Sequence, residues 1–219
     1  MPDLKTTLHL DMLRAFQQSR ASLPTRLYRA VKRELAPSVY GLNWGDPETV
    51  EPLRFIRDRY VTPYVRSDQT GLEIGPGGGR WTRYLIGFRK LHVVDYYGEI
   101  LDELRKNFSS PNMLFIRNNG MDFPGVDDHS IDYLFSFGTF VHLDVPIIEG
   151  YLKNMKRLLK QESNVVLQYS DKRKVMAQNA SFSDNNPEIM RRLIIENGYK
   201  ILEEDLTSMW HSAVVRFTI

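Results

Sequence analysis

The residues from about 70 onward alternate between two hydrophobic patterns. Short apolar runs of strand length alternate with longer segments in which apolar residues recur at helical spacing. The strand-like segments are 70–75, 90–96, 112–118, 131–137, 163–170, 199–206 and 212–219. The helix-like segments are 79–88, 98–108, 145–160 and 186–198, and Gly198 marks the end of the last one.

Strands that alternate with helices predict a parallel sheet with helices on both faces. The last two strands differ because only a few residues join them, which predicts antiparallel pairing. We therefore expect an α/β fold with a doubly wound sheet of seven strands, the last of them antiparallel.

The first third of the chain has a different character. Residues 3–36 predict one or two helices, with Pro24 starting the second and Pro37 ending it. This second segment is basic and is interpreted either as a solvated face or as a surface for an anionic acceptor or a membrane. A further helix is expected at 48–65, broken at Pro63. The expected organisation is a helical N-terminal extension or cap over residues 1–45, followed by one domain over 46–219.

Composition removes several function classes. The 219 residues include no cysteine, which excludes disulfides, thiolate metal sites and a cysteine nucleophile. A net charge of +2 offers no electrostatic case for a nucleic-acid partner. No apolar run reaches the ~18 residues that span a bilayer, and the N-terminus lacks an apolar signal core. We expect no integral membrane segment and a cytoplasmic location.

The stretch "LEIGPGGGRWT" at 72–82 joins the first strand to a helix. Its glycines let the backbone turn sharply and approach a ligand closely. No Lys-Ser/Thr pair follows, so it is not the phosphate-binding loop of nucleotide hydrolases. The acid Glu73 precedes the glycines, which suits a ligand with an ammonium group better than a pyrophosphate. Asp95 ends the next strand, where an acid accepts hydrogen bonds from ribose hydroxyls.

Over residues 70–219 this combination resembles the class I S-adenosylmethionine-dependent methyltransferases, which have a Rossmann-like sheet. The resemblance implies S-adenosyl-L-methionine as cofactor, with the glycine loop around its methionine part and Asp95 at its ribose. The cofactor contacts that it implies are Glu73, Gly75, Gly77, Gly79, Asp95, Tyr96, Asn119, Gly120, Met121, Asp122 and Phe137. For Asp122, a turn or helix-cap role stays open. A nicotinamide-binding domain is the alternative, but it requires a separate substrate domain of over 100 residues.

Candidate catalytic residues follow the later strands, since sites in such sheets lie beyond the carboxyl ends of the strands. They are His142, Asp144 and His211, with Tyr169, Ser170, Asp171 and Trp210 expected nearby. His142 is the preferred general base because an imidazole of ordinary pKa removes protons at neutral pH. The alternatives are that His142 packs against a helix start, or that Asp144, Asp171 and a histidine hold a metal. No spacing resembles a known metal motif, so we expect no metal site.

Longer stretches suggest an acceptor. "NWGDPE", "FSFGTFVHLD" and "DNNPEIMRRLIIENGYKI" look like small methyltransferases of polysaccharide and glycan pathways. This resemblance implies O-methylation of a sugar hydroxyl in a glycan or glycoconjugate, with a small-molecule or glycan acceptor and a glycosyltransferase as partner or fused domain. Two alternatives stay open. One is a methyltransferase of another small molecule, such as a phenol, quinone, lipid or amine, and the other is a non-catalytic cofactor-binding module.

Overall fold

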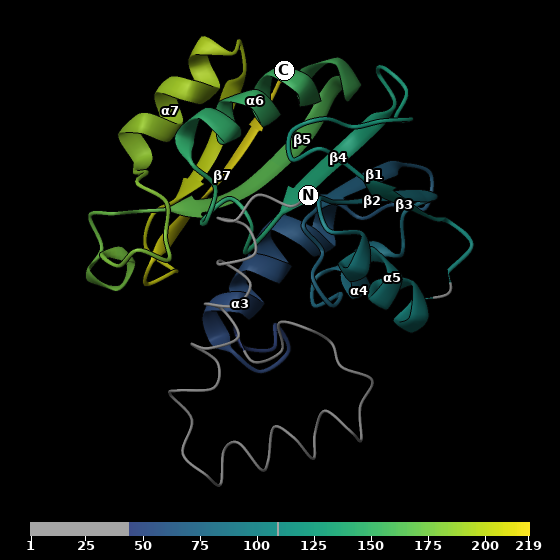
Figure 1. Cartoon of the computed structure of the whole chain (residues 1–219), viewed down its shortest axis with the longest axis horizontal. Helices are drawn as coiled ribbons and strands as arrows, with labels where there is room; N and C mark the ends of the chain where they lie inside the picture. The colour runs from purple at the N-terminus through teal and green to yellow at the C-terminus, as the bar shows by residue number, and fades with distance from the viewer. Residues whose placement is uncertain (1–43, 109) are drawn as a thin grey trace, which may run out of the picture. The chain divides into compact units, whose positions relative to one another are not determined.

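The computed structural model describes residues 44–108 and 110–219, all of which lie in the compact unit Val39–Ile219. They form one seven-stranded sheet with the order β3-β2-β1-β4-β5-β7-β6 (Figure 1). The strands are β1 Thr70–Ile74, β2 Lys90–Asp95, β3 Met113–Arg117, β4 Ile131–Ser136, β5 Leu159–Ser170, β6 Lys200–Asp205 and β7 Ser212–Thr218. The first five pair in parallel, and β7 runs antiparallel to both of its neighbours. The predicted fold class is confirmed.

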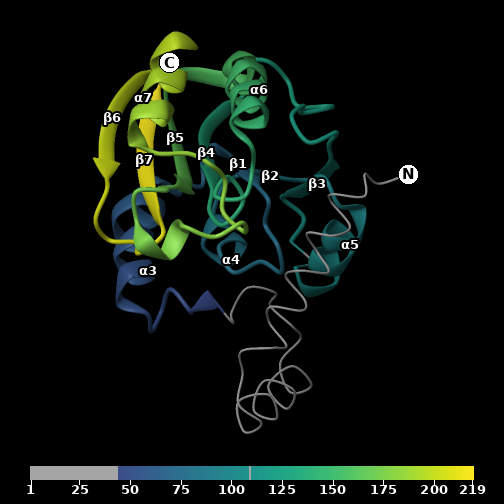
Figure 2. The ribbon, with the colours of Figure 1, turned by 60° about the vertical axis from the view of Figure 1, so that its left-hand side comes forward.

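Helices cover both faces of the sheet (Figures 1 and 2). The α-helices are α3 Glu51–Ile56, α4 Thr82–Leu85, α5 Gly98–Asn107, α6 Val145–Met155 and α7 Pro187–Glu196. Buried side chains of α6 and α7 pack with one face of the sheet, and those of α3, α4 and α5 pack with the other. A π-helical turn, Arg57–Val61, and a 3-10 turn, Thr62–Tyr64, continue α3. The helix expected at 48–65 is therefore present in altered form, with Pro63 in its last turn.

Two helices, α4 and α6, are shorter than the ranges that the sequence predicted for them, 79–88 and 145–160. Helix α4 has four residues instead of ten, because Gly77 and Gly79 adopt positive φ angles and delay its start. Helix α6 ends at Met155, one 3-10 turn follows, and β5 begins at Leu159 beside Ile131. The segment 156–160 favours a helix locally, but pairing with β4 overrides that preference.

The boundaries of α7 agree with its sequence signals. The side chain of Asn186 accepts a hydrogen bond from the backbone N–H of Ile189 at 2.9 Å, and Pro187 occupies the first turn. Gly198 follows the helix with φ +75°, which is the left-handed conformation that ends many helices.

The helices predicted within 3–36 and the basic segment lie outside the described residues, as does most of the N-terminal extension. Within the described part of the chain, no helix combines the length and apolar character that crossing a membrane requires.

Gly79 gives a stability prediction. It has φ +95°, and a Cβ there would overlap the ring of Phe108. Gly125 has φ +73°, but a Cβ there would meet nothing within 4 Å. Both alanine variants hold an alanine at a positive φ angle, which is unfavourable, whereas only Gly79→Ala also places a methyl group against the ring of Phe108. We expect Gly79→Ala to lower the free energy of unfolding by about 1–3 kcal/mol more than Gly125→Ala, measured by urea unfolding. Equal losses would contradict the packing argument.

Candidate functional site

The predicted site residues gather at one edge of the sheet. Strands β1, β2, β4 and β5 are parallel, so their carboxyl ends share this edge, at the lower side of Figure 1. Strand β7 begins here, since Ser212 pairs with Ser170 at the end of β5. The antiparallel last strand therefore brings His211 to the same edge as the loops after β1 and β4, as the sequence predicted.

The glycine loop after β1 touches the loop after β4. Gly75 has φ +69° and donates from its N–H to the carbonyl of Val94 at 2.8 Å. The hydroxyl of Thr139 donates to the carbonyl of Gly75 at 3.3 Å, and a Cβ on Gly75 would overlap that hydroxyl. Gly77 also has a positive φ, +55°. Glycine is needed at position 75 because two loops meet there with no room for a side chain.

The carboxyl group of Glu73 is buried beneath this loop. Its side chain is 2% exposed, and Oε2 accepts a hydrogen bond from the Thr82 hydroxyl at 2.6 Å. Burial raises the pKa of Glu73 to about 8, against the opposing effect of the Thr82 bond and with a smaller contribution from Asp95. Glu73 thus ties the first residue of α4 to β1 instead of facing the surface.

Asp95 lies at the end of β2 and is 8% exposed. Its Oδ1 accepts a hydrogen bond from the backbone N–H of Tyr97 at 2.8 Å, and burial raises its pKa to about 6. The partly buried Tyr96 follows, and its ring lies 3.7 Å from the place of a Cβ on Gly120. The loops after β2 and β3 are therefore neighbours at this edge.

The loop after β3 is held by its own side chains. Oδ1 of Asp122 accepts from the N–H of Asn119 at 2.8 Å, and Oδ1 of Asn119 accepts from the N–H of Asp122 at 3.1 Å. Gly120 between them has φ +102°. Met121 reaches α6, where it leaves no space for a Cβ on Gly150. Asp122 therefore has the turn-stabilising role that the sequence left open for it.

Phe137 follows β4 and is 7% exposed. Its ring lies 4.7 Å from the ring of Trp81, which is buried in the core beneath α4. The guanidinium group of Arg80 lies over both rings, and burial lowers its pKa to about 10. Trp81 is therefore a core residue that supports this edge from beneath.

Two histidines contact one aromatic ring at this edge. Nδ1 of His142 lies 2.5 Å from the carbonyl oxygen of Ser181, and its ring stacks on Phe182 at 5.5 Å. The ring of His211 lies 4.8 Å from Phe182 at a 42° tilt. Burial, with smaller contributions from the neighbouring basic side chains His142, Lys174 and Arg80, lowers the pKa of His211 to about 4. Residues about 70 positions apart in the chain thus meet around Phe182.

Other expected members of this cluster have different roles. Tyr169 is fully buried in the core that α6 and α7 cover, so it does not reach the site. Asp171 is 1% exposed, and Arg173 donates to both of its oxygens, at 2.9 and 3.0 Å. Asp144 is exposed and occupies the N-cap position of α6, without a side-chain capping bond. Trp210 is 64% exposed, beside His211 in the chain. The expected convergence of two histidines, two aspartates and a tyrosine is wrong for Tyr169.

Phe182 and Gln168 were not among the predicted site residues. Gln168 is 1% exposed, accepts from the N–H of Gly138 at 2.7 Å, and donates to the Ser212 hydroxyl at 2.7 Å. It therefore links the ends of β4 and β5 to the start of β7. Phe182 lies in a polar loop without periodicity, so no pattern marked it, and Gln168 was visible only as a polar residue inside a strand that should be buried.

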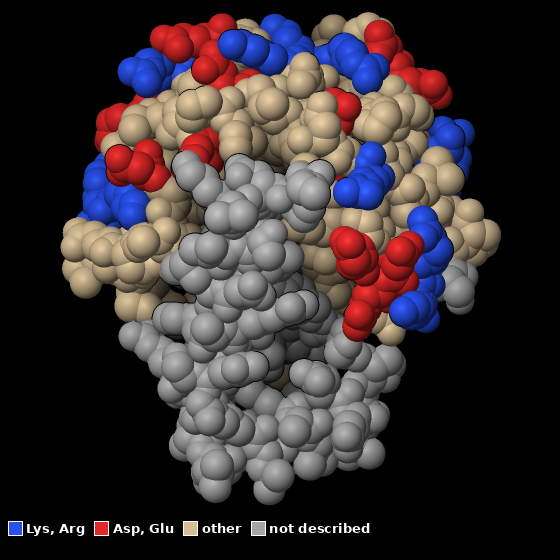
Figure 3. Space-filling model, viewed as in Figure 1, with Lys and Arg blue, Asp and Glu red and all other residues tan. Residues whose placement is uncertain are grey.

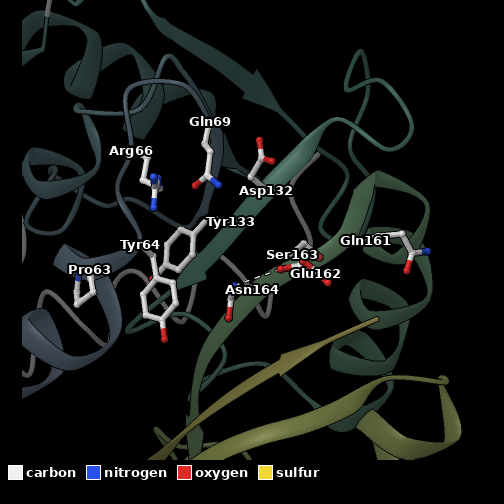
Figure 4. Close-up of a pocket in the computed structure, with 10 residues that line it drawn as sticks. All are labelled: Pro63, Tyr64, Arg66, Gln69, Asp132, Tyr133, Gln161, Glu162, Ser163 and Asn164. Carbon is white, nitrogen blue, oxygen red and sulfur yellow. Dashed lines mark hydrogen bonds between the residues drawn. The ribbon is translucent and has the colours of Figure 1, made fainter.

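A cavity of about 360 Å³ lies at the opposite, amino edge of the sheet (Figure 4). The stacked rings of Tyr64 and Tyr133, with centroids 5.6 Å apart, form one side of it. Asp132 in its wall accepts hydrogen bonds from Lys160 and from the backbone N–H of Thr70. None of the predicted site residues lines this cavity.

Among 44–108 and 110–219, no three histidine, aspartate or glutamate side chains come together in a group that could hold a metal ion. On the face drawn in Figure 3, acidic and basic side chains are interspersed over the described surface.

Comparison with known proteins agrees with this architecture. Residues 72–162 match the methyltransferase domain family. A methyltransferase from Clostridium acetobutylicum, S-adenosylmethionine-dependent by its description, superimposes with a TM-score of 0.63 at 11% identity, covering 90% of this chain and 99% of that one. The geranyl diphosphate C-methyltransferase from Streptomyces coelicolor gives 0.62 at 12% identity, covering 78% and 80%. A chain from the Haloferax volcanii complex of the Trm112 activator with a methyltransferase gives 0.59 at 14%, covering 78% and 95%. No curated protein matches the chain significantly.

The sheet with its antiparallel β7 is the Rossmann-like methyltransferase fold. Together, the domain match and the fold support an S-adenosylmethionine-dependent methyltransferase, with S-adenosylmethionine as its cofactor. The residues present fit this cofactor. The left-handed glycines allow close approach of a ligand to the backbone, and the buried carboxylate of Asp95 is an acceptor for ribose hydroxyls.

The buried Glu73 gives a pH prediction. A carboxyl whose pKa is about 8 in the native state and 4.5 ordinarily contributes stability below pH 4.5, and this contribution is lost as pH rises to 8. In Glu73→Gln the amide oxygen still accepts from Thr82, but no proton is lost. We expect the variant to gain on the order of a few kcal/mol over wild type between pH 5 and pH 8, measured by urea unfolding.

Glu99→Gln, which changes an exposed carboxylate on α5, is the control and should follow the wild-type pH dependence. A constant difference between Glu73→Gln and wild type over this pH range would show that Glu73 does not retain its proton.

Proposed function

We propose that the protein transfers the methyl group of S-adenosylmethionine to a hydroxyl of a sugar in a glycan or glycoconjugate, with His142 as general base. The observation that carries the proposal is the 2.5 Å contact between Nδ1 of His142 and the carbonyl of Ser181. A carbonyl oxygen only accepts hydrogen bonds, so Nδ1 carries the proton of the neutral ring. Nε2 is then the ring nitrogen that bears the lone pair, which is the tautomer that a general base needs.

A base is needed because a sugar hydroxyl has a high pKa and attacks poorly while it keeps its proton. The cofactor supplies the electrophilic methyl group when bound, and the residues of this chain supply orientation and proton removal. His142 belongs to the loop after β4, next to the contact between Thr139 and Gly75, so the base and the glycine loop are held by one connected segment.

The proposal also assigns residues to the binding of the cofactor. Glu73, Gly75, Gly77 and Gly79 surround the methionine part of the cofactor, and Asp95 holds its ribose. Support comes from the left-handed glycines and the buried carboxylate at the end of β2. The remaining proposed cofactor contacts, toward the adenine and the sulfonium, are Tyr96, Asn119, Gly120, Met121, Asp122 and Phe137.

The acceptor side comprises His211 and Asp144, in addition to His142. His211 has a pKa of about 4 and is therefore neutral at pH 7, so it offers one hydrogen-bond donor and one acceptor to a hydroxyl. The exposed indole of Trp210 offers a stacking surface for a sugar ring. The assignment of a sugar rests on the resemblance of "NWGDPE", "FSFGTFVHLD" and "DNNPEIMRRLIIENGYKI" to glycan methyltransferases.

The domain organisation extends this proposal. Residues 1–45 serve as a cap on the acceptor side or as a link to a glycosyltransferase partner, and residues 46–219 carry methyl transfer. The proposed location is cytoplasmic.

His142→Ala tests the base. Removing Nε2 removes the proton acceptor but none of the proposed cofactor contacts. We expect turnover to fall by about 10²-fold or more while S-adenosylmethionine affinity, measured by calorimetry, stays within a factor of about two. His129→Asn is the control, because His129 lies before β4 at the amino edge and has φ +50°, which asparagine tolerates. An unchanged rate in His142→Ala would dismiss the base.

The acceptor class is tested with labelled S-adenosylmethionine and a panel of rhamnosides, other glycosides, phenols, quinones and amines. We expect label on the glycosides. Label on phenols, quinones or amines alone would refute the sugar assignment and leave the methyltransferase class intact. Absence of calorimetric binding of both S-adenosylmethionine and S-adenosylhomocysteine would overturn the cofactor assignment itself.

A further inference from the structure

The side chain of Lys174 lies in the loop after β5 and reaches the loop between β6 and β7. Its ammonium nitrogen donates to three backbone carbonyls, those of Leu206 at 2.6 Å, Met209 at 2.7 Å and Ser212 at 2.7 Å. A lysine ammonium has three N–H donors, so these three bonds use its whole capacity. One side chain thus binds the beginning and the middle of the six-residue loop 206–211 and the first residue of β7.

This loop carries His211 and Trp210 to the carboxyl edge. Its first turn is supported separately, because Oδ1 of Asp205 accepts from the N–H groups of Thr207 and Ser208 at 3.0 Å. Its far end is met by the N–H of Asp171, which donates to the carbonyl of His211 at 3.1 Å. The carbonyls of Met209 and Ser212, which accept from Lys174, lie on either side of Trp210 and His211 in the chain. Lys174 therefore fixes the backbone before and after these two residues.

The consequence extends to the other histidine. The ring of His211 contacts Phe182, and Phe182 also stacks on His142, whose Nδ1 meets the carbonyl of Ser181. The loop containing Ser181 and Phe182 follows Lys174 in the chain. A connected set of contacts therefore runs from the ammonium group through His211 and Phe182 to His142.

An ammonium group is particularly suited to this task. It is compact and directs three donors to separate oxygens, whereas the planar guanidinium of arginine cannot match three convergent carbonyls. The bonds also differ from an ion pair, because Arg173 already holds the neighbouring carboxylate of Asp171. Burial lowers the pKa of Lys174, against the attraction of Asp171 and Asp205, so the carbonyl bonds take the place of lost water.

We propose that Lys174 is a positioning residue that sets the place of His211, and through Phe182 that of His142, at the acceptor side of the site. The positioning of His211 by Lys174 concerns the folded chain alone. Its effect on methyl transfer rests on the proposed function. The position of His211 can be followed without any acceptor, since burial lowers the pKa of its imidazole to about 4 and a displaced ring would lose that burial.

The test compares Lys174→Arg, Lys174→Met and Lys172→Met. Lys172 is the matched control, because it lies in the same loop and its ammonium donates to the single carbonyl of Asn179. The imidazole pKa of His211 is measured by NMR, and the hydrogen exchange of the Asp171 amide reports its bond to His211. S-adenosylhomocysteine binding is measured by calorimetry in every variant and shows that the cofactor half is folded.

We expect the pKa of His211 to rise by about one unit or more in both Lys174 variants, and exchange at Asp171 to accelerate at least tenfold. Lys172→Met should match wild type. Lys174→Arg keeps the positive charge, so a pKa that rises only in Lys174→Met would indicate a charge effect and overturn the positioning role. Unchanged values in both variants would overturn it as well.

The same variants separate this proposal from the proposed function. Lack of S-adenosylhomocysteine binding in wild type would defeat the proposed function, while the NMR result would still decide the role of Lys174. With an acceptor identified, Lys174→Arg should raise the acceptor KM several-fold and lower kcat, with cofactor affinity retained. If a Lys174 variant shifts the pKa of His211 but leaves the acceptor KM and kcat unchanged, the position of His211 does not affect methyl transfer.

Discussion

The carboxyl edge of the sheet depends on the close contact between the ends of β1 and β4. The Ser136 hydroxyl donates to the carbonyl of Ile74 at 2.8 Å, and one turn later the Thr139 hydroxyl donates to Gly75. The two strands are sequence-distant but adjacent in the sheet, and no side chain separates their exits. The segment that leads to His142 therefore begins in contact with the glycine loop.

Charge is distributed unevenly along this edge. Buried carboxyl groups, Glu73 and Asp95, lie at the ends of β1 and β2. The groups that lower the pKa of His211 near the start of β7 are all basic side chains: His142, Lys174 and Arg80. Carboxyl groups suit a cofactor that carries ammonium and sulfonium charges. Burial, together with the charges of Lys174 and Arg80, keeps the imidazole of His211 neutral at physiological pH. Neutral histidines are the ones that accept protons.

Much of this arrangement was predictable from the sequence, because short apolar runs predict the strands and the alternation of helices and strands predicts the topology. The antiparallel β7 followed from the short connection before it, and it correctly brought His211 to the edge. Side-chain direction was harder to predict. Tyr169 and Gln168 are adjacent on β5, yet alternation along a strand sends the tyrosine to the α6–α7 core and the glutamine to the other face. The lengths of α4 and α6 were missed because glycine conformation and strand pairing override local helix preference. Phe182 depends on tertiary contacts that no periodic pattern records.

The hydrogen bond between Glu73 and Thr82 has a thermodynamic consequence for ligand binding. With a pKa of about 8, the carboxyl group of Glu73 keeps its proton at neutral pH while it is covered by the glycine loop. A cation brought against this group lowers its pKa and drives the proton into solution. The measured heat of binding would then contain the ionisation heat of the buffer, and it would change with the choice of buffer even though the affinity did not. The acid that begins the glycine motif thereby couples ligand uptake to proton release.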